Sequence, residues 1–102
     1  MRKIRRGEAL RKLAQHMEEL RAMGVTSLEL FGSVARDEAT AESDVDLLIE
    51  LDPEKPIGLF DFVAIQQRIE SILDVRKVDL TMRDCVFDEL KERIYGEAVR
   101  VT

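Results

Sequence analysis

Two aspartates separated by one residue, Asp44 and Asp46, open a predicted strand that runs from Asp44 to Leu51. Side chains alternate between the two faces of a strand, so these two carboxylates share a face, with their Cα atoms about 7 Å apart. The opposite face of the strand is wholly apolar. Carboxylates this close repel each other unless a cation lies between them, which suits a site that binds a hard divalent metal through oxygen ligands. A solvated strand edge is the alternative explanation for such a pair.

A third carboxylate, Asp79, lies between two apolar residues in another predicted strand, Lys77–Thr81. Strand alternation places it on the polar face, either as one charge shown to solvent or as a partner of Asp44 and Asp46. Three converging carboxylates can hold two divalent ions about 3.5–4 Å apart. We therefore consider Asp79 a candidate third member of the metal site.

A Gly-Ser pair, Gly32 and Ser33, follows an earlier predicted strand, Leu28–Phe31. Ser33 is expected to be the N-cap of a short helix, Val34–Arg36. The unpaired backbone N–H groups and the Ser hydroxyl at such a point suit a phosphate, although a Gly-Ser pair after a strand is more often only a turn. A nucleotide with its phosphates on this turn, beside metal-binding carboxylates, would undergo phosphoryl or nucleotidyl transfer.

These residues need a scaffold that brings them together, and alternating helical and strand patterns predict one. The predicted helices run from about Arg6 to Met23, from Leu59 to Leu73, and from about Asp84 to Tyr95 with Gly96 at its end. A short edge strand over Ala98–Val101 is also expected. The resulting order, α-β-α-β-α-β-α, predicts an α/β or α+β fold with helices packed on a small sheet that contains some parallel pairing. The sequence does not determine the strand order.

Length and composition narrow the class of protein. A chain of 102 residues with 45% apolar residues predicts a single domain, residues 1–102, with one modest core. A net charge of −5 argues against binding to a nucleic-acid backbone. One cysteine, Cys85, excludes an internal disulfide. With no signal peptide and no apolar run of about 18 residues, we expect a cytoplasmic protein without a membrane partner.

The string GSVARDEATAESDVDLLIEL, with ten residues between Gly32-Ser33 and Asp44-Val45-Asp46, resembles the signature of the DNA polymerase β-like nucleotidyltransferase superfamily. It is close to the corresponding string of the minimal nucleotidyltransferase family. The segments IGLFDFVAIQQRIESILDVRKVDL and DELKERIYGEAVRV resemble the helix, third strand and C-terminal helix of that family. The resemblance covers roughly residues 10–101 and implies a polymerase β-like nucleotidyltransferase fold, reduced to its catalytic core with a small mixed sheet.

The resemblance also implies roles for individual residues. Gly32 and Ser33 would hold the triphosphate of ATP. Asp44 and Asp46 would bind both Mg²⁺ ions, and Asp79 would complete the metal site and is the candidate general base toward the acceptor hydroxyl.

Two neighbouring residues carry a weaker implication. Arg36 matches a family arginine that would brace the loop or contact phosphate. The family usually has Gly next, where this chain has Asp37, whose added negative charge could weaken nucleotide binding.

Members of the family are typically antitoxins that transfer AMP from ATP to a tyrosine of a HEPN-domain ribonuclease toxin and so inactivate it. The resemblance therefore implies an Mg²⁺-dependent protein adenylyltransferase with a HEPN-type toxin as its partner. An alternative is an antitoxin that neutralises its toxin only by binding. A nucleotidyltransferase for small molecules usually needs a second domain to build the acceptor pocket, for which 102 residues leave no space.

Overall fold

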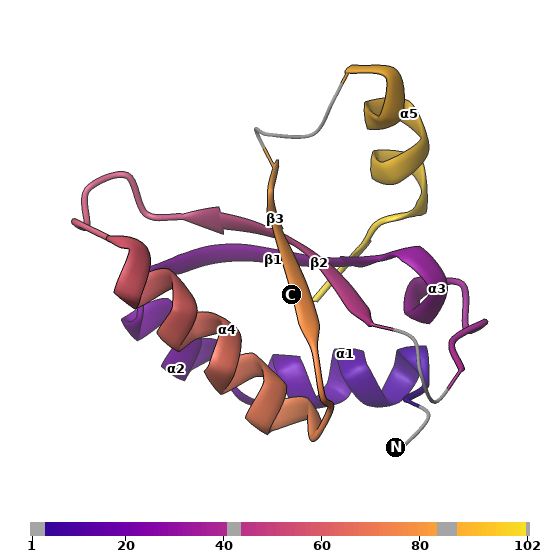
Figure 1. Cartoon of the computed structure of the whole chain (residues 1–102), viewed down its shortest axis with the longest axis horizontal. Coiled ribbons are helices and arrows are strands. Elements are labelled where there is room, and N and C mark those ends of the chain that lie inside the picture. Colours follow the sequence, from indigo (N-terminus) through magenta and orange to yellow (C-terminus); the bar gives the residue numbers. More distant parts are fainter. Residues whose placement is uncertain (1–3, 41–43, 84–87, 102) are drawn as a thin grey trace.

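The structure is a computed structural model that describes residues 4–40, 44–83 and 88–101. Its centre is a four-stranded sheet with the strand order β3-β2-β1-β4 (Figure 1). The strands are β1 (Val25–Phe31), β2 (Val45–Leu51), β3 (Val78–Met82) and β4 (Val99–Arg100). β1 is antiparallel to β2 and β4, whereas β2 and β3 are parallel. The predicted small mixed sheet is therefore confirmed.

Helices cover the sheet unequally (Figure 1). They are α1 (Arg6–Gln15), α2 (Met17–Ala22), α3 (Gly32–Ala35), α4 (Leu59–Leu73) and α5 (Asp88–Glu97). α1, α2 and α4 pack on one side, where the apolar faces of strands and helices form the core. That core includes Ala9, Leu13, Met17, Leu20, Leu28, Leu30, Leu47, Ile49, Ile65 and Ile69, each at most 2% exposed. Across the parts of the chain that the structure describes, no helix is long and apolar enough to span a membrane.

The bounds of α4 agree with the prediction, but the N-terminal helix does not. The predicted single helix is divided into α1 and α2 at His16, whose φ of −110° and ψ of 8° interrupt the regular helix. Because the sheet is twisted, one straight helix of this length would diverge from its surface. Two shorter helices can each direct an apolar face onto the sheet. β1 begins at Val25, three residues before the predicted start at Leu28.

The prediction for the turn after β1 was also wrong in detail. α3 begins at Gly32, its N-cap residue is Phe31, and no side chain caps it. Ser33 is therefore inside the first turn, because Gly32 itself adopts the positive φ, +76°, at which the chain turns.

The C-terminal helix α5 includes Gly96 and ends at Glu97, so Gly96 does not stop it as predicted. The predicted start of this helix at Asp84, and Cys85, lie outside the described residues. β2 and β3 each begin one residue after the predicted start. The edge strand is present as β4.

Candidate active site

Strand register brings three of the predicted site residues together. Asp46 of β2 lies opposite Asp79 of β3, and on its other side Asp46 lies opposite Phe31 of β1. Gly32 follows Phe31 directly, so the Gly-Ser turn and two carboxylates meet at the same end of the sheet. Asp44 immediately precedes β2.

The contact between Gly32 and Asp46 requires glycine. A Cβ atom built on Gly32 would lie 2.4 Å from Oδ2 of Asp46, well inside van der Waals contact. The positive φ of +76° at Gly32 is also unfavourable for residues with a Cβ. The absence of a side chain therefore allows the turn to lie directly against the carboxylate.

Lys77, a residue that the sequence analysis did not select, contacts the predicted metal ligands. Its Nζ lies 3.7 Å from Oδ2 of Asp44 and 3.6 Å from Oδ1 of Asp79. Within the described part of the chain, no three His, Cys, Asp or Glu side chains already form a ligand set for a metal ion. A divalent ion bound to Asp44 and Asp79 would compete with the Lys77 ammonium for the same carboxylate oxygens. The spacing of two residues between Lys77 and Asp79 was the signal that could have identified it.

The electrostatics of Asp46 fit a cation site. Partial burial raises the pKa of Asp46 to about 6, and the Asp79 and Asp44 carboxylates add to the rise. The positive charges of Arg36 and Lys77 act in the opposite direction. The surroundings of Asp46 thus disfavour its ionised form, and a bound cation would favour it. The donor atoms available are carboxylate oxygens, the ligands that Mg²⁺ prefers. By this chemistry Asp44, Asp46 and Asp79 are candidate ligands of a divalent metal.

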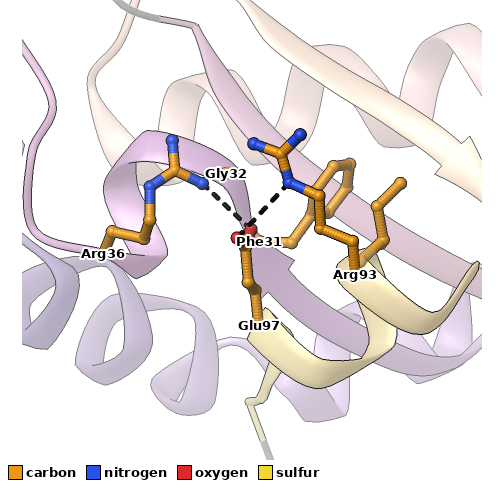
Figure 2. Close-up of a pocket in the computed structure, with 6 residues that line it drawn as sticks. Phe31, Gly32, Arg36, Arg93 and Glu97 are labelled. Atoms are coloured by element: carbon orange, nitrogen blue, oxygen red, sulfur yellow. Dashed lines mark hydrogen bonds and ion pairs between the residues drawn. The ribbon is translucent and has the colours of Figure 1, made fainter. Parts of the chain in front are cut away.

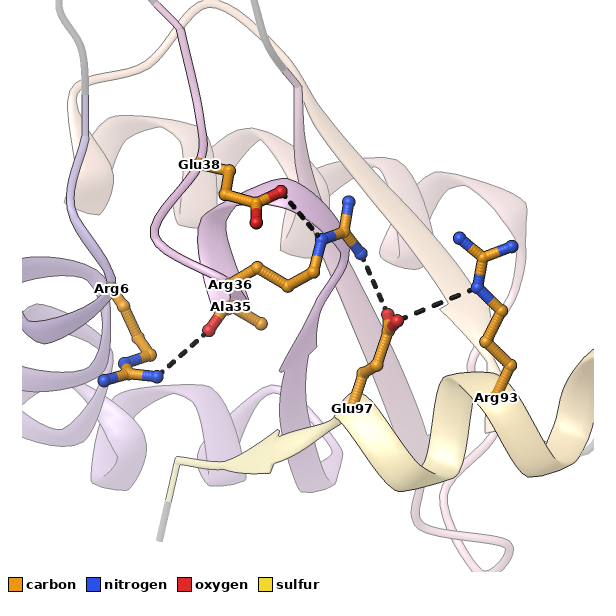
Figure 3. A network of polar contacts seen from close by, with 6 residues as sticks. All are labelled: Arg6, Ala35, Arg36, Glu38, Arg93 and Glu97. Atoms are coloured by element: carbon orange, nitrogen blue, oxygen red, sulfur yellow. Dashed lines mark hydrogen bonds and ion pairs between the residues drawn. The ribbon is translucent and has the colours of Figure 1, made fainter.

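Arg36 links the segment after α3 to α5 (Figure 3). Its Nη1 donates a hydrogen bond of 2.9 Å to Oε2 of Glu97 in α5, and its Nε donates one of 3.3 Å to Oε2 of Glu38. Arg6 adds a link from α1, because its Nη1 donates to the carbonyl oxygen of Ala35 at 3.3 Å. The bracing role considered for Arg36 stays a prediction.

Asp37 occupies a position suited to glycine. Its φ is +59°, in the left-handed region that Asp tolerates better than most residues. Its Oδ1 accepts a hydrogen bond of 3.2 Å from the backbone N–H of Arg6, the first residue of α1. The carboxylate thus pairs with one of the N–H groups that the first turn of a helix leaves without an internal partner.

A cavity of about 220 Å³ adjoins the Gly-Ser turn, between α3 and α5 (Figure 2). It is lined by Phe31, Gly32, Arg36, Arg93, Ile94 and Glu97. The sequence analysis missed Arg93 and Glu97. Their spacing of four residues on a predicted helix was a signal for an ion pair, but not for a cavity.

A mixed sheet that carries paired carboxylates beside a Gly-Ser turn defines the nucleotidyltransferase class. Comparison with known proteins agrees, because the nucleotidyltransferase domain family matches residues 10–101. The chain belongs to this family, and the prediction of a nucleotidyltransferase is confirmed.

Similar proteins narrow the class. The chain is 36% identical over 90 residues to protein adenylyltransferase MntA of Thermococcus cleftensis, covering 87% of this chain and 88% of that protein. It is 37% identical over 78 residues to a protein of Methanocaldococcus jannaschii provisionally named a protein adenylyltransferase, covering 76% and 81%. A solved structure provisionally named a minimal nucleotidyltransferase is 31% identical, with a TM-score of 0.67 over 88% of this chain and 93% of that one.

Proposed function

We propose that this protein transfers AMP from ATP to a hydroxyl group of a partner protein, and that the acceptor is a tyrosine of a HEPN-type ribonuclease toxin. The observation that carries the proposal is the register of Asp46 opposite Asp79, directly beside Gly32. The names of the similar proteins, which are protein adenylyltransferases, support a protein acceptor. The toxin and its tyrosine rest on the resemblance to minimal nucleotidyltransferases.

In this proposal the turn and the carboxylates have separate tasks. Gly32 and Ser33 hold the triphosphate so that the α-phosphate lies near Asp46, since Gly32 and Asp46 are in close contact. Asp44, Asp46 and Asp79 would hold two Mg²⁺ ions, which polarise the α-phosphate and neutralise the pyrophosphate when bound.

The reaction exchanges one bond for another. The acceptor oxygen forms a bond to the α-phosphorus while the bond from that phosphorus to the bridging oxygen of the β-phosphate breaks, and pyrophosphate leaves. The hydroxyl proton passes to a carboxylate oxygen of Asp79, the candidate general base. Arg36 supports the turn through Glu38 and Glu97 during this exchange.

The test is the intact mass of a HEPN-domain protein encoded beside this gene, after incubation with ATP, Mg²⁺ and this protein. We expect the wild type to add one or more AMP groups and the Asp44→Asn/Asp46→Asn variant to add none. Glu54→Gln serves as the matched control, because Glu54 is an exposed carboxylate in the turn after β2. If neither wild type nor variant modifies the partner and the two proteins still copurify, the binding-only antitoxin replaces this proposal.

A further inference from the structure

The outer side of α4, the helix that connects β2 to β3, is apolar where a solvated helix carries charged and polar residues (Figure 1). Phe60 and Leu59 are 89% and 75% exposed, and Val63, one turn further along, is 38% exposed. α4 has seven exposed residues, and Asp61 is the one charged residue among them, in a chain with 36% charged residues. The seven are Leu59, Phe60, Asp61, Val63, Ala64, Gln67 and Ser71. A patch of exposed apolar side chains of this kind marks an interaction surface.

Five of these residues lie along one side of the helix, and we call them the α4 stripe. The stripe consists of Phe60, Val63, Ala64, Gln67 and Ser71, which recur at helical spacing. The charged residues beside the stripe bond to the protein itself. Arg68 donates a hydrogen bond of 2.8 Å to Oε2 of Glu19, and Oε2 of Glu70 accepts one of 3.0 Å from the backbone N–H of Val78. The stripe is therefore an uncharged surface whose neighbouring charges are already paired within the chain.

The side chains of the α4 stripe are bulky at one end and small at the other. Phe60 and Val63 lie in the N-terminal half of α4, and Ser71 lies in its last turn. Two stripes packed antiparallel about a two-fold axis would place the phenyl ring of each copy against the small Ser71 of the other. A parallel pair would oppose the two copies of Phe60 and the two copies of Ser71, so that the bulky ends hold the small ends apart. The sizes of the side chains therefore favour the antiparallel pair.

The charges at the two ends of α4 favour the same arrangement. The N-terminal end has an excess of negative charge, from Asp52, Glu54, Lys55 and Asp61. The C-terminal end has no such excess, because Asp74 is accompanied by the exposed Arg76 and by Lys77, which also contacts two site carboxylates. A parallel pair would bring two acidic ends together, whereas an antiparallel pair separates them and places each near an arginine of the other copy.

We propose that the α4 stripe is the contact surface of a two-fold symmetric dimer of this protein, in which the two α4 helices are antiparallel. A two-fold contact requires one self-complementary surface, and the stripe is self-complementary in both size and charge. Along β2, Asp46 alternates with the core residues Val45 and Leu47, so the site carboxylates lie on the face of the sheet away from α4. Both active sites therefore stay accessible in the dimer, and the inference does not depend on the proposed function.

The test is sedimentation equilibrium of the purified chain at micromolar to millimolar concentrations. We expect the wild type to change from monomer to dimer as the concentration rises. Phe60→Asp should raise the Kd of the dimer by at least about a hundredfold, because each of the two copies loses a buried aromatic side chain and gains a charge. Phe60 is the second residue of α4, where an acidic side chain is favourable, so the circular dichroism spectrum should stay that of the wild type.

Two further variants serve as control and as a test of orientation. Ala14→Asp adds the same charge at an exposed position of α1 and should leave the Kd unchanged. Arg76→Glu makes the C-terminal end acidic and should raise the Kd about threefold or more at low ionic strength, an effect that added salt removes. In a parallel dimer this change would replace one pair of like charges by another, so an unchanged Kd overturns the antiparallel arrangement.

A wild type that stays monomeric at every concentration, or a dimer that Phe60→Asp does not weaken, overturns the inference. Copurification with the partner protein separates the remaining case. If the wild type is monomeric and Phe60→Asp abolishes that copurification, the α4 stripe binds the partner protein and not a second copy of this chain.

Discussion

Replacing Asp46 with Asn should stabilise the folded protein in the absence of metal, although it removes a residue central to the proposed reaction. The reason is that burial and the neighbouring carboxylates raise the pKa of Asp46 to about 6. Above that pH the folded protein carries an ionised group that its surroundings disfavour. Asn has a similar shape and no charge, so it avoids this cost.

The magnitude follows from the change in pKa. A rise from 3.8 to about 6 corresponds to at most about 3 kcal/mol, at about 1.4 kcal/mol for each pKa unit. Asp46 is only partly buried, so screening by solvent reduces the expected gain to about 1 kcal/mol. In a domain of this size that gain raises the midpoint of thermal unfolding by about 4–8 °C.

The pH dependence has a definite sign. Between the unfolded pKa near 3.8 and the folded pKa near 6, the folded wild type binds more protons than the unfolded chain, so its stability falls as the pH rises. The gain from Asp46→Asn should therefore be complete above about pH 6 and vanish near pH 4.

The assay is thermal unfolding followed by circular dichroism from pH 4 to pH 8, in EDTA, with the pH range chosen about these values. Glu50→Gln is the matched control, since Glu50 is an exposed carboxylate on the same face of the same strand. It should change stability by less than about 0.5 kcal/mol at every pH.

Added Mg²⁺ should stabilise the wild type and not the Asp46→Asn variant. A variant that is less stable than the wild type at pH 7.5, or a gain that does not depend on pH, would refute the reasoning.

Two further predictions concern the turn. Gly32→Ala should lower the free energy of unfolding in urea by about 1–3 kcal/mol, because the new Cβ lies at a positive φ and against Asp46. Gly7→Ala is the control and should be neutral or stabilising, because nothing lies within 4 Å of its new Cβ. Asp37→Ala should cost about 1–2 kcal/mol, because it loses the hydrogen bond to Arg6 and keeps the left-handed conformation. Asp37→Gly should be closer to the wild type in the same assay, because it relieves the backbone strain, and equal losses in the two variants would contradict this account.

Local sequence patterns were sufficient to predict features that depend on a single helix or strand. The helix Leu59–Leu73 has both of its predicted bounds, because its apolar residues repeat at helical spacing between clear stop signals. Strand alternation also placed Asp46 and Asp79 on polar faces. Their register could not be read from either strand, since it depends on which strands are neighbours and in which direction they run.

Long-range contacts explain most of what the sequence did not reveal. Arg36 and Glu97 are separated by 61 residues, and no local pattern relates them. The start of β1 was missed because Thr26 and Ser27 break the apolar alternation, at a point where the register with β2 shifts.

Lys77 shows how the carboxylates coexist in the folded chain. Its ammonium lies within 3.7 Å of Asp44 and 3.6 Å of Asp79, so it partly offsets the repulsion that contributes to the raised pKa of Asp46. The side chain of Lys77 is 57% exposed, and exposed ion pairs contribute less than about 1 kcal/mol. A divalent cation, with twice the charge, can therefore displace this ammonium at little cost to folding. Lys77 directly precedes β3, so one short segment supplies both a carboxylate of the site and its exchangeable counter-ion.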